Sequence, residues 1–264
     1  MVKATDVTIR LRHPSGRCFQ LNCPQFLAQS GQITCVIGKN GSGKSTLLRA
    51  LGGIIPIDSG TISIDGSGRN LKRKCTWLEA SDADQLVPFL SVRDHLRAVL
   101  GNEDIDILFS DSPDQADAQS SPKSLPSGIR ALLSQNSTSR VCDLSTGQRQ
   151  ALRLAMCFLH HRPVILADES TANLDSINGK NIFGEFREIV KREQAAAILV
   201  THDLFLASEF ADAVYVVADG CVCLMPENAS GRKRPPGELR EYLDTGSAIY
   251  EQQRSAGSQS HHKV

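Results

Sequence analysis

The feature that most limits the fold is a glycine-rich segment between an apolar stretch and a helical one. Residues 38–45 read GKNGSGKS and fit the pattern G-x-x-x-x-G-K-[ST]. The apolar run Ile33–Ile37 before it predicts a buried strand. Residues 45–51 after it predict a helix that ends at Gly52 and Gly53. This strand–loop–helix order indicates an α/β fold.

The glycine-rich segment also predicts a phosphate site. Glycines let successive backbone N–H groups converge on phosphate oxygens, and the helix N-terminus adds partial positive charge. Lys44 is expected to reach the β- and γ-phosphates, and the Ser45 hydroxyl to bind Mg²⁺. We therefore predict that ATP binds to the whole segment, namely Gly38, Lys39, Asn40, Gly41, Ser42, Gly43, Lys44, Ser45 and Thr46.

A pair of acidic residues follows a second apolar strand. The run Val164–Ala167 is typical of a strand buried in a parallel sheet, and it ends at Asp168 and Glu169. Ligands of open α/β sheets lie at the carboxyl ends of the strands. We expect Asp168 to hold Mg²⁺ through water and Glu169 to polarise an attacking water.

The rest of the chain alternates between predicted strands and helices. Two short strands, 5–11 and 18–22, are joined by a turn at residues 13–16. Further helices are predicted at 91–100, 128–133, 151–158, 182–191 and 204–210, and further strands at 61–65, 196–200 and 214–217. Residues 102–127 are rich in Asp, Ser, Gln and Pro and predict a loop.

Composition excludes some functions. The 264 residues contain 29 basic and 29 acidic side chains, so net charge offers no argument for nucleic-acid binding. No apolar run approaches the ~20 residues of a membrane span, and the N-terminus lacks a signal-peptide core. We therefore expect a cytoplasmic chain with reduced cysteines. Cys221 and Cys223 share one face of a predicted strand, but no second Cys/His pair at zinc spacing accompanies them.

Three further motifs resemble one family. Leu144, Ser145, Thr146, Gly147 and Gln148 resemble the LSGGQ signature of ATP-binding cassette (ABC) ATPases, with Thr146 in place of the first glycine. Residues 172–175 resemble the D-loop, with its aspartate at Asp175, and residues 201–203 resemble the switch-histidine motif, with its histidine at His202. The motifs also follow the family's order, and the resemblance covers about residues 5–225.

The resemblance implies the architecture of the cassette. It implies an α/β P-loop core with a mainly parallel sheet flanked by helices. An N-terminal antiparallel β subdomain and a helical signature subdomain would complete it. On this basis the ATPase domain spans residues 1–244, the helical subdomain is inserted at about 82–160, and 245–264 form a disordered tail.

The resemblance also implies a mechanism. Two cassettes would pack head to tail, with each ATP between one chain's phosphate loop and the other's signature. Glu169 would be the general base, and His202 would contact the γ-phosphate. Hydrolysis would remove the phosphate that joins the halves, and the dimer would open.

Two positions depart from the family pattern. His13 stands where an aromatic residue usually stacks on adenine, and it is either a weaker stacking residue or a plain turn residue. Asp82 stands where the family has a glutamine that senses Mg²⁺ and links the site to the transmembrane partner. Asp82 itself, or the nearby Gln85, is the candidate for this Mg²⁺ contact.

The predicted function is that of an ATP-binding and ATP-hydrolysing subunit that drives a separate membrane permease from its cytoplasmic face. Since every motif is present in this chain, a homodimer would have two complete sites, and a heterodimer is also consistent. The alternatives are a soluble, non-transport ABC ATPase acting on a protein or nucleic-acid assembly, and a regulatory cassette that barely hydrolyses ATP. The motifs serve ATP, so they do not indicate the cargo.

Overall fold

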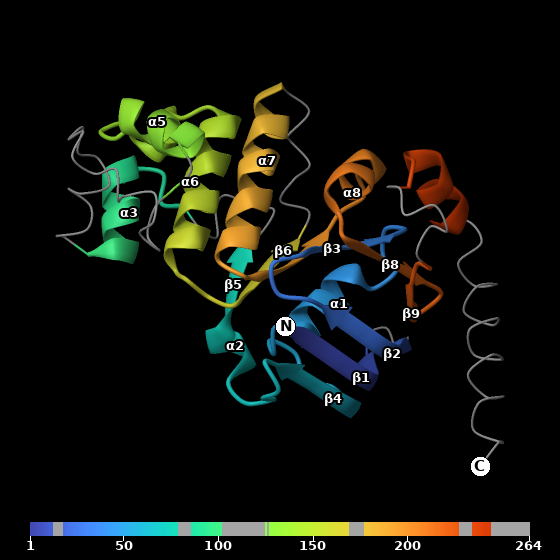
Figure 1. The fold of residues 1–264 in the computed structure, drawn as a ribbon. Helices are drawn as coiled ribbons and strands as arrows, with labels where there is room; N and C mark the ends of the chain where they lie inside the picture. The colour runs from blue at the N-terminus through green and yellow to red at the C-terminus, as the bar shows by residue number, and fades with distance from the viewer. Residues whose placement is uncertain are drawn as a thin grey trace, which may run out of the picture.

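The computed structural model describes residues 1–12, 18–78, 86–101, 125, 127–168, 177–226 and 234–243. These residues form one nine-stranded sheet with helices packed around it (Figure 1). The strand order is β4-β1-β2-β9-β8-β3-β7-β6-β5. The sheet divides into an antiparallel end and a parallel end.

The antiparallel end is built from the N-terminal strands. Strand β1 (Val2–Arg12) pairs antiparallel with both β2 (Cys18–Ala28) and β4 (Ser59–Ile64). Val2 and Ala4, and then Val7 and Ile9, are buried, because successive side chains of a strand point to opposite faces. An irregularity between Thr5 and Thr8 shifts this alternation by one residue. This confirms the predicted antiparallel β subdomain.

The parallel end carries the apolar runs. It consists of β8 (Ala213–Ala218), β3 (Ile33–Gly38), β7 (Ala196–Val200), β6 (Val164–Asp168) and β5 (Cys75–Leu78). Every residue of β3 and β7 is buried, as expected for strands covered on both faces. Strand β9 (Cys221–Leu224) pairs antiparallel with β8 and parallel with β2, and so joins the two ends.

The helices fall into two groups. Near the sheet lie α1 (Lys44–Leu51), α2 (Leu71–Lys74), α8 (Leu204–Phe210) and a helical stretch over residues 236–243. The other group comprises α3 (Val92–Leu100), α5 (Ser127–Gln135), the 3₁₀ turn η3 (Val141–Asp143), α6 (Thr146–Leu159) and α7 (Ile177–Arg192). Helices α3, α5 and α6 lie together at one side of the molecule (Figure 1). The mainly parallel sheet flanked by helices is as predicted.

Most predicted elements are confirmed, with longer strands at the N-terminus. Strand β5, helix α2 and the helical stretch 236–243 had no predicted counterpart. Cys35 and Cys157 are buried as small core residues, as predicted, and burial raises the pKa of Cys35 to about 12. Most of the predicted loop 102–127 and the whole predicted tail 245–264 lie outside the described residues.

Two absences concern the described ranges. No helix among them combines the length and the apolar character that crossing a membrane requires. No three His, Cys, Asp or Glu side chains among them are grouped so that they could hold a metal ion. Cys221 and Cys223 lie half-buried on either side of the buried Val222, so their thiols share one face as predicted.

Candidate nucleotide site

The site begins where three parallel strands end side by side. Strand β7 lies between β3 and β6 in the sheet. Val200 of β7 pairs with Val36 on one side and with Asp168 on the other, so the three residues lie at one level. The glycine-rich loop, Asp168 and the 201–203 motif therefore lie together at the carboxyl ends of these strands, although they are far apart in sequence.

Lys44 is held inside the glycine-rich loop. Its side chain is buried, and its Nζ donates to the carbonyl oxygens of Gly38 at 2.9 Å and Lys39 at 3.0 Å. Both acceptors lie at the start of the loop, so one ammonium group ties the start of the loop to the first turn of α1. The loop is thus closed around a positive charge, as a phosphate site requires.

The glycines of the loop are needed for steric reasons. Gly43 precedes α1 with φ +107°, and a Cβ at this position would lie 2.6 Å from the ring of Phe19. A Cβ at Gly38 would lie 2.5 Å from the carbonyl oxygen of Val217. Gly41 has φ +77° and open space around it within the described residues. Only glycine meets these conditions without strain or movement of neighbours.

The predicted magnesium residues lie in contact. The Ser45 hydroxyl donates to Oδ1 of Asp168 at 3.0 Å, which joins α1 to the end of β6 across 123 positions of sequence. A hydroxyl and a carboxylate oxygen at one point are the kind of donors that Mg²⁺ prefers. The Ser42 hydroxyl is buried in the same loop with no hydrogen-bond partner in the described part of the chain. These oxygens fit a phosphate-bound Mg²⁺.

In the 201–203 motif, hydrogen bonds hold the residues on both sides of His202 in place. Thr201 is buried, and its N–H donates to the carbonyl oxygen of Val36 at 3.2 Å. The Asp203 carboxylate caps α8 by accepting from the N–H groups of Phe205 at 2.8 Å and Leu206 at 3.1 Å. Between them His202 is exposed, at the same edge as the glycine-rich loop.

A cavity of about 470 Å³ opens beside the glycine-rich loop. Its walls come from β2, the loop itself, the β8–β9 turn and the C-terminal helical stretch. They include Cys18, Phe19, Gln20, Lys39 to Ser42, Val217 to Gly220, and Leu243. Sequence reasoning missed the residues outside the loop, since only the pairing of β9 with both β2 and β8 brings the β8–β9 turn to this place. A cavity of this size, next to a phosphate site, suits a nucleoside.

The signature is built as the start of α6. The Ser145 hydroxyl accepts from the Gln148 N–H at 3.3 Å, and the Gln148 side chain accepts from the Ser145 N–H at 2.7 Å, which forms a capping box. Gln148 also donates to Asn136 at 3.3 Å, and Thr146 accepts from Arg149 at 3.4 Å. Ser145 and Thr146 are exposed. In the part of the chain that the structure describes, the hydrogen bonds of residues 145–148 stay within this helical group.

Five of the predicted site residues lie outside the described residues. They are His13, Asp82, Gln85, Glu169 and Asp175. Their roles stay predictions from the sequence.

The comparisons with known proteins agree with this geometry. Residues 21–172 match the sequence model of the ABC transporter family. The chain belongs to the ABC transporter family. It is 30% identical over 224 residues to a protein named as a hemin import ATP-binding protein, HrtA, of Staphylococcus epidermidis. That alignment covers 81% of this chain and 95% of the relative.

Two solved structures show the same fold. The chain resembles CbiO1 of Clostridium perfringens, part of an ABC transporter complex, with a TM-score of 0.68, 21% identity and 98% coverage of both chains. It resembles a dimeric ATP-binding cassette in a post-hydrolysis state, bound to ADP and phosphate, with a TM-score of 0.63 and 22% identity. That likeness covers 84% of this chain and 96% of the other. Within its family, this chain is the ATP-hydrolysing subunit.

Proposed function

We propose that this cassette hydrolyses ATP in a site completed by a second copy of the chain, bound head to tail. The proposal rests on a difference between the two halves of the predicted site, the glycine-rich loop and the signature. The glycine-rich loop is closed around Lys44 and joined to Asp168 through Ser45, whereas the signature is an exposed, capped helix start. A second chain would bring its signature to the γ-phosphate, where the helix N-terminus favours negative charge.

Each residue has a proposed task. Lys44 binds the β- and γ-phosphates, and Ser45 with Asp168 would hold Mg²⁺, which neutralises charge on the transferred phosphate. Glu169 accepts a proton from the attacking water, and His202 orients that water and contacts the γ-phosphate. The signature residues of the partner donate from the opposite side.

We also propose that a membrane permease docks on the loop before α3. This loop exposes three apolar side chains, of which Phe89 is 77% exposed, Val87 51% and Leu90 43%. Clustered apolar exposure of this kind marks interaction surfaces. CbiO1 is described as part of an ABC transporter complex, and this supports a transport component as the class of partner.

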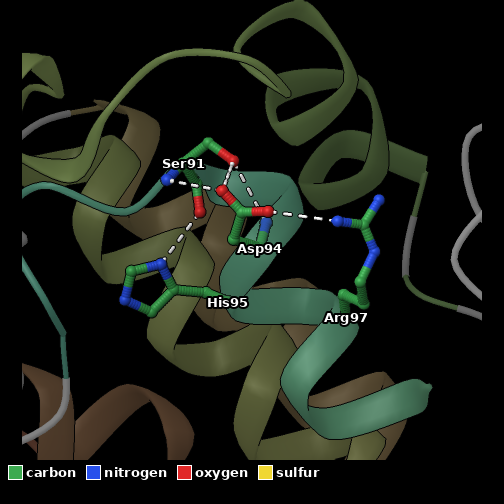
Figure 2. Close-up of polar contacts among 4 residues, drawn as sticks. All are labelled: Ser91, Asp94, His95 and Arg97. Carbon is green, nitrogen blue, oxygen red and sulfur yellow. Dashed lines mark hydrogen bonds and ion pairs between the residues drawn. The ribbon is translucent and has the colours of Figure 1, made fainter. Parts of the chain in front are cut away.

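The docking loop is rigidly supported. His95 is buried, with Nε2 lying 2.9 Å from the Val87 N–H and Nδ1 lying 2.9 Å from the Ser91 carbonyl oxygen, so the ring spans the loop. Asp94 completes a capping box with Ser91 and contacts Arg97 at 3.2 Å (Figure 2). The hydrogen bonds from Ser91, and then Arg97, lower the pKa of Asp94, which keeps it ionised in this role.

The same loop is hydrogen-bonded to the segment before the signature. The Val141 N–H donates to Leu90 at 3.1 Å, and the Cys142 N–H donates to Pro88 at 2.9 Å. We therefore expect movement of a docked permease to be transmitted to the signature through these backbone hydrogen bonds. This gives a physical route from the membrane partner to the ATP site.

The test of the dimer uses the Glu169→Gln variant. It should bind ATP, fail to turn it over, and accumulate as an ATP-bound dimer in light scattering after size exclusion. A matched Lys44→Ala, Glu169→Gln double variant should stay monomeric, because it cannot bind ATP. A Glu169→Gln chain that remains monomeric at saturating ATP contradicts the head-to-tail site.

The test of the permease uses the same trapped variant. Tagged Glu169→Gln chain, purified with ATP from detergent-solubilised native cells, should bring a multi-span membrane protein in stoichiometric amount. Phe89→Glu in this background should lose that protein and keep the ATP-bound dimer. Recovery with soluble partners alone would favour the non-transport alternative.

A further inference from the structure

A second cavity lies at the opposite end of the sheet from the N-terminal strands. It measures about 290 Å³ and opens between β5 and the C-terminal half of α6. Strand β5 is the last strand of the sheet, so within the described residues one edge of its backbone has no strand beside it. Helix α6 and β5 are in contact, with β5 near the lower end of α6 in Figure 1. None of the ATP-site residues described above lines this cavity.

The wall of the cavity has an apolar part and a cationic part. Trp77 and Met156 supply half-buried apolar surface. His160, Arg162 and the buried Arg153 supply basic groups. No acidic residue is among the described residues that line the cavity.

The local charges leave the cavity positive. Arg162 is exposed and makes no ion pair within the described ranges. The nearby acidic residue Glu193 is already engaged by Arg192 at 3.1 Å and by His161 at 3.5 Å. Partial burial, followed by the charge of Arg162, lowers the pKa of His160. A bound anion would offset this repulsion between His160 and Arg162.

A buried hydroxyl adds a polar contact. Thr76 is 9% exposed, and its Oγ1 has no hydrogen-bond partner in the described part of the chain. Buried polar groups without a partner are uncommon, because they lose their water without replacement. Thr76 lines the cavity, so a ligand oxygen could supply the missing partner.

We propose that this cavity binds a small organic anion. Its apolar body packs on Trp77 and Met156, and its carboxylate or phosphate group contacts Arg162, His160 and Thr76. The volume, about 290 Å³, is close to the lower limit of ligand pockets, which is roughly 300 Å³. Converging polar groups beside apolar surface are typical of such sites. Since α6 begins at the signature, a ligand here links the edge of the sheet to the signature helix.

The experiment uses Trp77, the single tryptophan of the chain, as a fluorescent reporter inside the cavity. The full-length chain is titrated with phenyl phosphate, with benzoate and with the uncharged benzyl alcohol. We expect a saturable change in fluorescence with at least one anion, at least tenfold tighter than any change with benzyl alcohol. Whichever anion binds more tightly identifies the charged group.

Three variants locate the binding. Arg162→Gln alters an exposed side chain and should weaken the anion at least tenfold. Lys3→Gln, which removes an exposed charge on β1, should leave the affinity unchanged. Lys44→Ala should also leave it unchanged, which excludes the phosphate loop as the source of the signal. The proposal is overturned by no saturable change with either anion, by unchanged affinity in Arg162→Gln, or by loss of binding in Lys44→Ala.

Discussion

The phosphate loop and the signature, which we propose to contact the same phosphate, are built in opposite ways. The loop is finished within one chain, since Lys44 is buried against two loop carbonyls and Ser45 reaches Asp168. The signature has its own cap, formed by Ser145 and Gln148, and presents an exposed helix start. The phosphate loop is therefore preorganised within one chain, and the exposed signature supports our proposal that a second chain completes the site.

Loss of the Lys44 ammonium group from the phosphate loop should have the largest effect, and it should act on ATP affinity. Lys44→Ala removes a buried charge that would contact two phosphates, and charged hydrogen bonds of this kind are strong. We expect ATP affinity to fall by about 100-fold or more, equivalent to ~2.7 kcal/mol. Equilibrium binding of a fluorescent ATP analogue measures this, and an unchanged affinity would remove the phosphate-loop assignment.

A negative charge in the signature should leave ATP binding unchanged and strongly reduce ATP hydrolysis. Gly147 has open space around it among the described residues, and an acidic side chain in the first turn of a helix is tolerated. Gly147→Asp should therefore keep its ATP affinity and thermal stability. Repulsion of the partner's γ-phosphate should lower ATPase activity by about 100-fold, the scale seen when such electrostatic contacts are lost. Full activity in this variant would show that the signature does not approach ATP.

Bound nucleotide should protect a cysteine beside the phosphate loop from chemical labelling, but not a cysteine beside the signature. This effect should be smaller than the two above. Cys18 is exposed and lines the cavity beside the phosphate loop, whereas the exposed Cys142 precedes the signature. ADP, which lacks the γ-phosphate that would recruit a partner, should slow maleimide labelling of Cys18 about tenfold, roughly the free fraction left at a tenfold excess over Kd. Labelling of Cys142 should not change. Peptide mass spectrometry measures both thiols, and equal protection of the two would place the nucleotide elsewhere.

The cap of the signature should contribute the smallest effect. Ser145→Ala removes a hydroxyl that accepts from the Gln148 N–H, and loss of an N-cap costs about 1 kcal/mol in the free energy of unfolding. Denaturant unfolding measures this, with Ser145→Thr as the conservative control. A loss near zero would show that the cap is dispensable in the isolated chain.

Much of the phosphate half was predictable from sequence, because its residues are consecutive. The loop, the strand before it and the helix after it were predicted at residues 33–51, and the structure places them there. The contact between Ser45 and Asp168 needed the sheet order, in which β7 is inserted between β3 and β6. The cavity wall at the β8–β9 turn likewise depends on strand pairing that leaves no local trace.

Other features of the structure are predictable from the sequence to different degrees. The capping box at Ser145 and Gln148 follows a recognisable S-x-x-Q pattern and could have been found. Strand β5 is four residues long and directly follows the short, basic helix α2, so it shows too few alternations for a prediction. The helical stretch at 236–243 begins at the second of two consecutive prolines and carries mixed polarity, so its sequence does not predict a helix.

The central claim is that each ATP site combines the loop of one chain with the signature of another. Mixing the Lys44→Ala chain with the Gly147→Asp chain tests it most directly, since each is defective in a different half. In a head-to-tail pair, the intact loop of the Gly147→Asp chain meets the intact signature of the Lys44→Ala chain. We predict that the mixture regains ATPase activity that neither variant shows alone. A mixture as inactive as its components, under conditions where the unmodified chain is active, would contradict the shared site.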